Sequence, residues 1–412
     1  RVFDSVESEG SLSESETDWL IRAPSVDLLG WAQVSGSGDS DAALRLLVET
    51  EEVRVDETAL AVNRIAVRFE QQTLDVSFEG EALAGRVQRI GTAPLAIDLE
   101  RLVLPEAGEF LAPPEPDPLM DFNPGELPSM EIAIADLLRG ETRYQDVRVT
   151  TVQGTDRLDV TRLAFVRDGQ GFAGEMAWQW TEAGPKTAIT LRAEGAELGQ
   201  FLRVNEKEPI LEASQGVFAA EFTWDGSPLG FSILTSGGWI SLSLEDGRFV
   251  DLGNSAEVLR LFGILNIETL TRRLRLDFLD LVKPGVAFDK VVATASVSDG
   301  LLTLDPEMAM EGPSSSFRLT GTANLAEKTL NQRLEIDIPL TNNLPLASVL
   351  LGAPQVGGAI YLVEKALGTK IIKVGKTDYR IEGSFDEPNI RIIPPFIGQK
   401  ESSNVDATTN GQ

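Results

Sequence analysis

The stretch FAAEFTWDGSP, from Phe218 to Pro228, decides the fold because its apolar side chains recur at every second position. That period predicts a β-strand with one apolar face, and the run Asp225-Gly226-Ser227-Pro228 is a turn signal that ends the strand. Strands that alternate in this way are half-buried and antiparallel, so the sequence predicts a mostly β protein. The same alternation is found in the segments 65–69, 74–78, 172–180, 240–244 and 334–338.

A weak repeat runs through these segments. The pattern aromatic-x-x-Val occurs at 3–6, 144–147 and 288–291, and each copy precedes a Leu-bearing strand and a Gly-containing strand. Repetition of one β unit predicts that similar strands stack along an axis, because each unit has an apolar face that its neighbours extend. Ordinary similarity between β-meanders is the alternative.

Charge and the missing residue types exclude several classes of function. The 412 residues include 36 Lys and Arg against 64 Asp and Glu, a net charge of −28, so the surface repels a phosphate backbone and we expect no nucleic-acid partner. The chain has no Cys and no His, which removes disulfides, Ser/His and Cys/His nucleophile pairs and the usual zinc sites. We therefore predict that it is not an enzyme and has no cofactor or metal.

The segment 254–278 changes its hydrophobic period part-way along. Asn254 can cap a helix whose apolar residues follow at helical spacing to Leu265, and after Arg273 the period falls to two. We expect a short helix that runs directly into a strand, and its arginines argue against a transmembrane span. The strand would carry on its apolar face Leu274, Leu276 and Phe278.

The segment 338–363 contains no charged residue. Prolines and glycines interrupt it, so we expect a hairpin of two short apolar helices near the C-terminal end of the sheet. Two roles stay open for this hairpin, a core element that plugs the end of the sheet or a contact with a membrane surface. The lysines that follow favour membrane contact. The residues expected at that contact are Leu350, Leu351, Ile360, Leu362, Lys370, Lys373 and Lys376.

Many weak matches along the chain resemble the C-terminal part of the large AsmA-like proteins of the YhdP type from Gram-negative bacteria. The resemblance covers nearly the whole chain and is strongest from Gly237 to Ile390. The stretches that carry it are LAIDLERLVLP, LPSMEIAIADLLRG, GGWISLSLEDGRFVDL, LRLFGILNIETLTRRLRLDFLDL, GVAFDKV, DGLLTLDPEMAMEGPSSSFRLTGTANL and YRIEGSFDEPNI.

This resemblance implies an elongated, curved antiparallel sheet that forms an apolar groove, in a periplasmic protein anchored in the inner membrane by a segment upstream of this chain. It implies transport of phospholipids, whose acyl chains slide along the groove toward the inner leaflet of the outer membrane, with envelope proteins as further partners in outer-membrane biogenesis. The residues expected to line the groove are Phe172, Met176, Trp178, Phe218, Phe222, Trp224, Ile240, Leu242, Leu244, Leu274, Leu276, Phe278, Leu302, Leu304, Phe317, Leu319, Leu334 and Ile336.

Five regions follow from this organisation. Residues 1–104 and 129–252 form groove repeats, and the proline-rich residues 105–128 form a linker or surface excursion. Residues 253–397 hold the C-terminal signature with the helix and the apolar hairpin, and residues 398–412 form a polar, disordered tail.

Two other functions compete with lipid transport. A periplasmic scaffold or assembly factor for outer-membrane proteins would use open sheet edges to hold client strands. A β-protein that acts on carbohydrates is a more distant alternative. A second sheet packed on the apolar face would give an ordinary sandwich core in place of a groove.

Overall fold

A computed structural model of the chain describes residues 7–12, 16–27, 43–55, 58–105, 116–196, 198, 211–249, 286–313, 316–339, 374–385 and 387–393. Apart from two short 3-10 turns, the regular elements of these ranges are strands. The strands of the first part are β1 (Glu7–Leu12), β2 (Glu16–Arg22), β3 (Ser25–Asp27), β4 (Ala43–Glu49), β5 (Glu52–Val55), β6 (Thr58–Ala61), β7 (Arg64–Glu70), β8 (Thr73–Glu79), β9 (Leu83–Ile90) and β10 (Leu95–Leu104).

Longer strands make up the second part. The turn η1 (Pro124–Glu126) precedes β11, and η2 (Pro228–Gly230) lies between β16 and β17. The strands are β11 (Met130–Arg139), β12 (Thr142–Gln153), β13 (Arg157–Arg167), β14 (Gln170–Thr181), β15 (Gly184–Gly195), β16 (Leu211–Asp225), β17 (Gly237–Phe249), β18 (Val286–Ser298), β19 (Leu301–Glu311), β20 (Ser316–Asn324), β21 (Thr329–Pro339), β22 (Val374–Ser384) and β23 (Pro388–Ile393).

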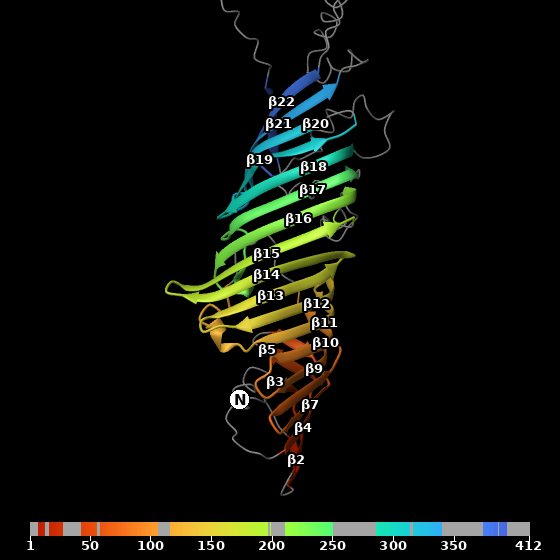
Figure 1. Ribbon diagram of the computed structural model, residues 1–412, viewed down its shortest axis with the longest axis vertical. Coiled ribbons are helices and arrows are strands. Elements are labelled where there is room, and N and C mark those ends of the chain that lie inside the picture. Colours follow the sequence, from red (N-terminus) through yellow and green to blue (C-terminus); the bar gives the residue numbers. More distant parts are fainter. Residues whose placement is uncertain are drawn as a thin grey trace, which may run out of the picture.

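Twenty of these strands form one sheet, and they stack along the long axis of the molecule nearly in chain order (Figure 1). Within this sheet the described pairs of neighbouring strands are antiparallel, with two exceptions: β2 with β4 and β10 with β11 are parallel. A parallel pair needs a connection that crosses from one end of the strands to the other, and residues 116–129, the described part of the connection between β10 and β11, pack through η1 against β12, β13 and β14. At about 4.8 Å per strand the stack is roughly 90 Å long.

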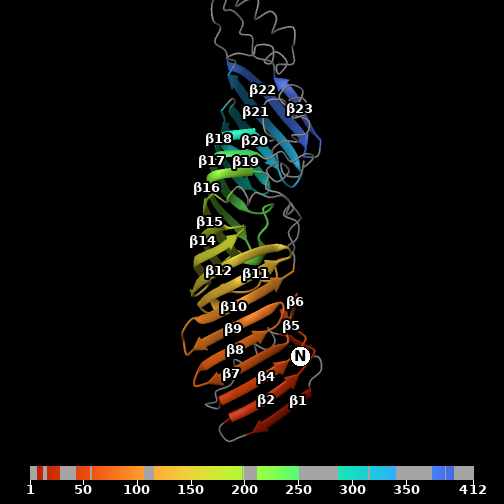
Figure 2. The same cartoon turned by 90° about the vertical axis from the view of Figure 1, so that its right-hand side faces the viewer.

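The sheet twists and curves along its length, which the view turned by 90° shows clearly (Figure 2). Several strand pairs contain a register shift, for example between Leu99 and Arg101 in β10 and between Leu304 and Met308 in β19. Such irregularities bend a strand and increase its twist, which helps a sheet of this size to curl rather than lie flat. The predicted elongated, curved, mostly antiparallel sheet is confirmed.

A second, three-stranded sheet of β3, β5 and β6 packs against the N-terminal strands of the large sheet. Val26, Val53 and Val62 from this part are fully buried, as is Ile65 of β7 on the opposing face. Between them they enclose an apolar core that also includes side chains of β8 and β9. At this end of the molecule a second sheet covers the apolar face. This is the sandwich arrangement that the sequence left open as an alternative to a groove.

Two predicted elements lie wholly or mostly outside the described residues. The helix and strand of 254–278 lie in the range 250–285, and most of the apolar hairpin lies in 340–373. The first two residues of the uncharged segment, Ile338 and Pro339, end β21 and pair with Gly375 and Val374 of β22, in keeping with the strand expected up to Ile338. Within the described part of the chain, no helix has the length and apolar character needed to cross a membrane.

Candidate functional site

The register of the large sheet shows what each of its faces carries, because directly opposed residues on neighbouring strands share a face. One row of opposed residues crosses every strand from β14 to β23, and its side chains are all aliphatic or aromatic. It consists of Phe172, Ala193, Phe218, Leu242, Ala293, Met308, Leu319, Leu334, Tyr379 and Ile392. We call the face that carries this row the inner face, and it forms a continuous apolar surface along half of the molecule.

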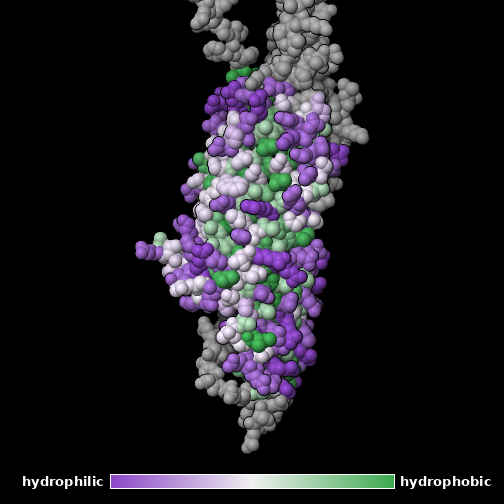
Figure 3. Space-filling model, viewed as in Figure 1, coloured by the Kyte–Doolittle hydropathy of each residue, from purple (hydrophilic) through white to green (hydrophobic). Residues whose placement is uncertain are grey.

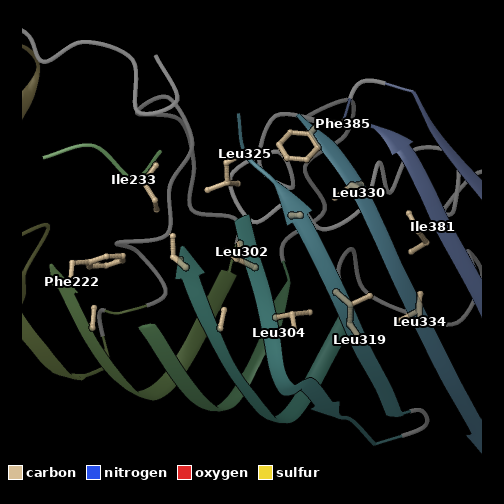
Figure 4. Close-up of a cluster of buried hydrophobic side chains, with 14 of the residues drawn as sticks. Phe222, Ile233, Leu302, Leu304, Leu319, Leu325, Leu330, Leu334, Ile381 and Phe385 are labelled. Carbon is tan, nitrogen blue, oxygen red and sulfur yellow. The ribbon is translucent and has the colours of Figure 1, made fainter. Parts of the chain in front are cut away.

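The described residues that were predicted to line a groove lie together on this inner face. Figure 4 shows the side chains of one cluster pointing to the same side of the curved strands. Buried in the clusters are Phe172, Phe222, Trp224, Leu244, Leu302, Leu304, Leu319, Leu334 and Ile336, and packed against them with partial exposure are Phe218, Ile240, Leu242 and Phe317. Trp178 is buried and Met176 half-buried on β14, whereas Leu274, Leu276 and Phe278 lie outside the described residues.

Residues 116–129, the described part of the connection between β10 and β11, cover part of the inner face. The ring of Phe122 stacks on the buried ring of Trp178, with 6.0 Å between the ring centroids. The side chain of Asn123 accepts a hydrogen bond from the Gly125 amide at 2.9 Å, and Gln153 of β12 donates to the Gly125 carbonyl at 2.6 Å. These bonds hold η1 against β12, β13 and β14.

The turn between β16 and β17 also folds over the inner face. The ring of Phe231 packs edge-on against Phe222 and Trp224, with centroids 5.7 Å and 5.1 Å apart. Ile233, three residues before the end of this turn, is 4% exposed and joins the same apolar cluster. We call residues 116–129 and 226–236 the covering segments.

Asp117 joins the two covering segments across 110 residues of sequence. Its carboxylate accepts hydrogen bonds from the Ser227 amide at 2.6 Å and the Ser227 hydroxyl at 2.7 Å. Glycines make room for the carboxylate, since a Cβ on Gly226 or Gly230 would lie 2.8 Å or 2.7 Å from its Oδ2 atom. Gly226 also has φ +128°, which disfavours any other residue there.

The opposite, outer face carries exposed ion pairs, most of them between neighbouring strands, together with exposed apolar residues such as Val217 and Val292. Arg86 of β9 pairs with Asp75 of β8, and the side chains of both lie away from the inner face. Comparable pairs are Arg143–Asp136, Arg248–Glu212, Arg318–Asp337, Arg333–Asp378 and Arg380–Glu382. Purple, hydrophilic residues gather along both long margins of the side seen in Figure 3, with paler and green residues between them. Charge is thus kept to the outer face and the margins of the sheet.

These ion pairs shift the acidity of the groups that form them. The hydrogen bond from Arg86 holds the pKa of the Asp75 carboxyl below its ordinary value, against the opposing effect of burial. The hydrogen bond from Arg248 likewise lowers the pKa of Glu212. Both carboxylates are therefore charged near neutral pH, as structural ion pairs are. Among the residues that the structure describes, no group of three or more acidic side chains is placed to hold a metal ion.

Several inner-face residues were not predicted. Tyr379 and Ile381 of β22 alternate with Arg380 and Glu382, so the period-two pattern could have identified them. Ile233 and Phe231 lie in a turn, where no periodicity marks the residues that fold back onto a sheet. Of the side chains expected at a membrane, only Lys376 belongs to a described element, β22, where its backbone pairs with Asp337. The others, Leu350, Leu351, Ile360, Leu362, Lys370 and Lys373, lie outside the described residues.

Comparison with known proteins identifies the family of this chain. A family model described as YhdP protein matches residues 6–390. The chain belongs to the YhdP family. It is similar to the intermembrane phospholipid transporter YhdP of Escherichia coli (strain K12), with 29% identity over 248 residues. That match covers 59% of this chain and 19% of the YhdP transporter. A search of the solved structures gave no match.

Proposed function

We propose that this part of a YhdP-family protein carries phospholipids between the inner and outer membranes, with their acyl chains lying along the inner face. The observation that carries this proposal is the unbroken row of aliphatic and aromatic residues from β14 to β23. The similar Escherichia coli protein is named as an intermembrane phospholipid transporter, which supports the same cargo.

The chemistry of the two faces suits such a cargo. Removing a CH₂ group from water is worth about 0.8 kcal/mol wherever it meets an apolar surface, so an acyl chain is held without depending on specific partners. A surface that is apolar along its whole length offers nearly the same stabilisation at each step, and a chain can therefore slide along it. The head group stays at the polar margins of the sheet, in contact with water (Figure 3).

The same proposal places the protein in the periplasm, anchored in the inner membrane outside this chain, and requires no bond-making chemistry. The outer-membrane inner leaflet would receive the lipid, and envelope proteins would be further partners. We keep Leu350, Leu351, Ile360 and Leu362, with Lys370, Lys373 and Lys376, as the proposed membrane contact, on the strength of their apolar and basic composition.

The test compares two neighbouring residues of β17 that face opposite sides. Leu242 lies on the inner face and is partly exposed, and Ser243 lies on the outer face beside Val217 and Val292. Leu242→Glu puts a charge where hydrocarbon must pass, so bound phospholipid, measured by extraction and mass spectrometry, should fall several-fold. Ser243→Glu should leave bound lipid unchanged. Equal lipid in both folded variants would reject the inner face as the lipid path.

A scaffold for outer-membrane proteins would bind polypeptides at its sheet edges in place of lipids on its inner face. In the described part of the sheet, β1 and β23 each pair on one side, so their other edges are where a client strand would add. Cross-linking through an introduced photoreactive residue at β23 would then capture a client polypeptide, and Leu242→Glu would not reduce that capture.

A further inference from the structure

Gln332 is a buried polar residue on the inner face, and unlike the buried Thr187 and Gln170 its side chain makes no hydrogen bond to a described residue. A second row of opposed residues runs beside the first, and Gln332 of β21 is the one member with a polar side chain. The row consists of Gly174, Leu191, Ala220, Ile240, Ala295, Leu304, Gly321, Gln332, Ile381 and Ile390. Gln332 is only 2% exposed, so its amide does not reach bulk water.

Among the residues that the structure describes, the amide of Gln332 has no hydrogen-bond partner at either its Nε2 or its Oε1 atom. Gly321 and Ile381 lie directly opposite on the neighbouring strands, and Leu330 and Leu334 lie two residues away on the same face. None of these side chains can donate or accept a hydrogen bond. A buried side-chain amide is nearly always paired in proteins, so this unpaired amide indicates a missing polar partner.

The charges near Gln332 limit what that partner can be. Arg318, Arg333 and Arg380, on the three strands around it, lie on the outer face and pair there with acidic side chains. Among the described residues of these strands, no cationic side chain shares the inner face with Gln332. A phosphate or carboxylate in so apolar a place would need a cation. The missing partner is therefore a neutral polar group.

We propose that Gln332 is a polar subsite that donates a hydrogen bond from Nε2 to the ester carbonyl of a lipid whose chains lie along the inner face. The ester is the neutral polar group attached directly to the acyl chain, so it follows the chain to the apolar surface more readily than the charged head group does. This inference rests on the proposed function and makes it specific, because it predicts that the protein distinguishes ester-linked lipids from ether-linked ones. An ether-linked lipid has the same chains and head group but lacks the carbonyl acceptor.

The experiment offers lipid-stripped protein an equimolar mixture of diester and diether phosphatidylethanolamine with identical chains, and measures the bound ratio by mass spectrometry. The wild-type protein should retain the diester form about 2- to 10-fold more strongly, the range expected for one hydrogen bond. Gln332→Leu, which keeps the size and removes the amide, should bring the ratio close to one. The matched control is Gln215→Leu, at an exposed position of β16, which should keep the wild-type ratio.

A second measurement covers the folding of the variant itself. Without lipid, Gln332→Leu and Gln332→Met should melt at a higher temperature than the wild type, because each removes an unpaired buried amide. A lower melting temperature for both would show that the amide is paired within the protein and overturn the subsite. Equal retention of the two lipids by the wild type, or an unchanged preference in Gln332→Leu, would also overturn it while leaving phospholipid transport standing. Failure of the wild type to retain either lipid would reject the proposed function together with the subsite.

Discussion

The apolar face of the large sheet is covered in two different ways along its length. At β7 and β8 a second sheet lies on it, and Ile65 and Val62 have no exposed surface at all. From β14 to β21 the described cover includes two irregular segments and Leu198, and most of the face is buried, but Phe218, Leu242 and Phe317 keep part of their surface exposed. The same alternating pattern therefore gives a closed core at one end and, at the other, an apolar face that is largely buried but keeps some side chains partly exposed.

The difference shows that strand alternation does not by itself distinguish a core from a binding surface. An apolar sheet face must be covered by something, and three short strands supply that cover near the N-terminus. Further along, residues 116–129 and 226–236 contact β14 and β16 through a few aromatic rings. Substitutions at the two ends of the molecule, with the stability of each variant measured, test this difference in cover.

The largest effect is expected in the closed core. Ile65→Asp buries a charge without a partner and should lower the free energy of unfolding by about 4 kcal/mol or more. Ala66→Asp, one residue along β7 and on the outer face, is the matched control and should cost far less. Chemical denaturation of both variants measures the difference. Similar stabilities would mean that this end is also open to solvent.

A smaller effect is expected where Asp117 joins the covering segments. Asp117→Ala removes the acceptor of two hydrogen bonds from Ser227 and should destabilise this junction by about 1–3 kcal/mol. Hydrogen exchange of the Ser227 and Leu229 amides should accelerate, while exchange in β7 and β8 stays unchanged. Asp121→Ala, an exposed position of the same segment, is the control. Unchanged exchange in Asp117→Ala would show that the segments hold independently of this carboxylate.

Truncation of an apolar side chain should cost less on the inner face than in the closed core. Leu242→Ala removes surface that is already partly exposed and should destabilise by about 1 kcal/mol, whereas Ile65→Ala should cost about 2–5 kcal/mol. Thermal or urea unfolding gives both values. If Leu242→Ala costs as much as Ile65→Ala, the face from β14 to β21 is a closed core and the lipid path is elsewhere.

The smallest effect is expected on the outer face. Because the folded-state pKa of Asp75 is lowered by Arg86, its contribution is fully present above the unfolded pKa of about 3.9 and is lost as pH falls through the lower folded value. Asp75→Asn should therefore be less stable than the wild type at neutral pH, by at most about 1 kcal/mol, and the gap should close in strong acid. A gap that widens below pH 4 would contradict this assignment of the ion pair.

Much of the fold follows from the sequence alone. Alternation placed Ile65, Phe222 and Leu334 on the apolar faces of strands, and Asp225 to Pro228 marked the end of β16, because a strand shows its two faces within a few neighbouring residues. The resemblance of the whole chain to the YhdP family indicated that these strands join into one elongated sheet. Alternation also held for β22, where Tyr379 and Ile381 follow the same rule.

What covers the apolar face was decided by the tertiary structure. Asp117 meets Ser227 across 110 residues, and the strands β3, β5 and β6 close a core that the sequence does not distinguish from the rest of the face. In the sequence Gln332 is one of three polar residues between Leu330 and Leu334, and only the structure shows that it is buried among apolar neighbours with no partner for its amide among the described residues. Local periodicity shows which side chains share a face of a strand. Contacts between distant segments depend on how the whole chain packs, because that packing decides which polar groups are buried and which of them form hydrogen bonds.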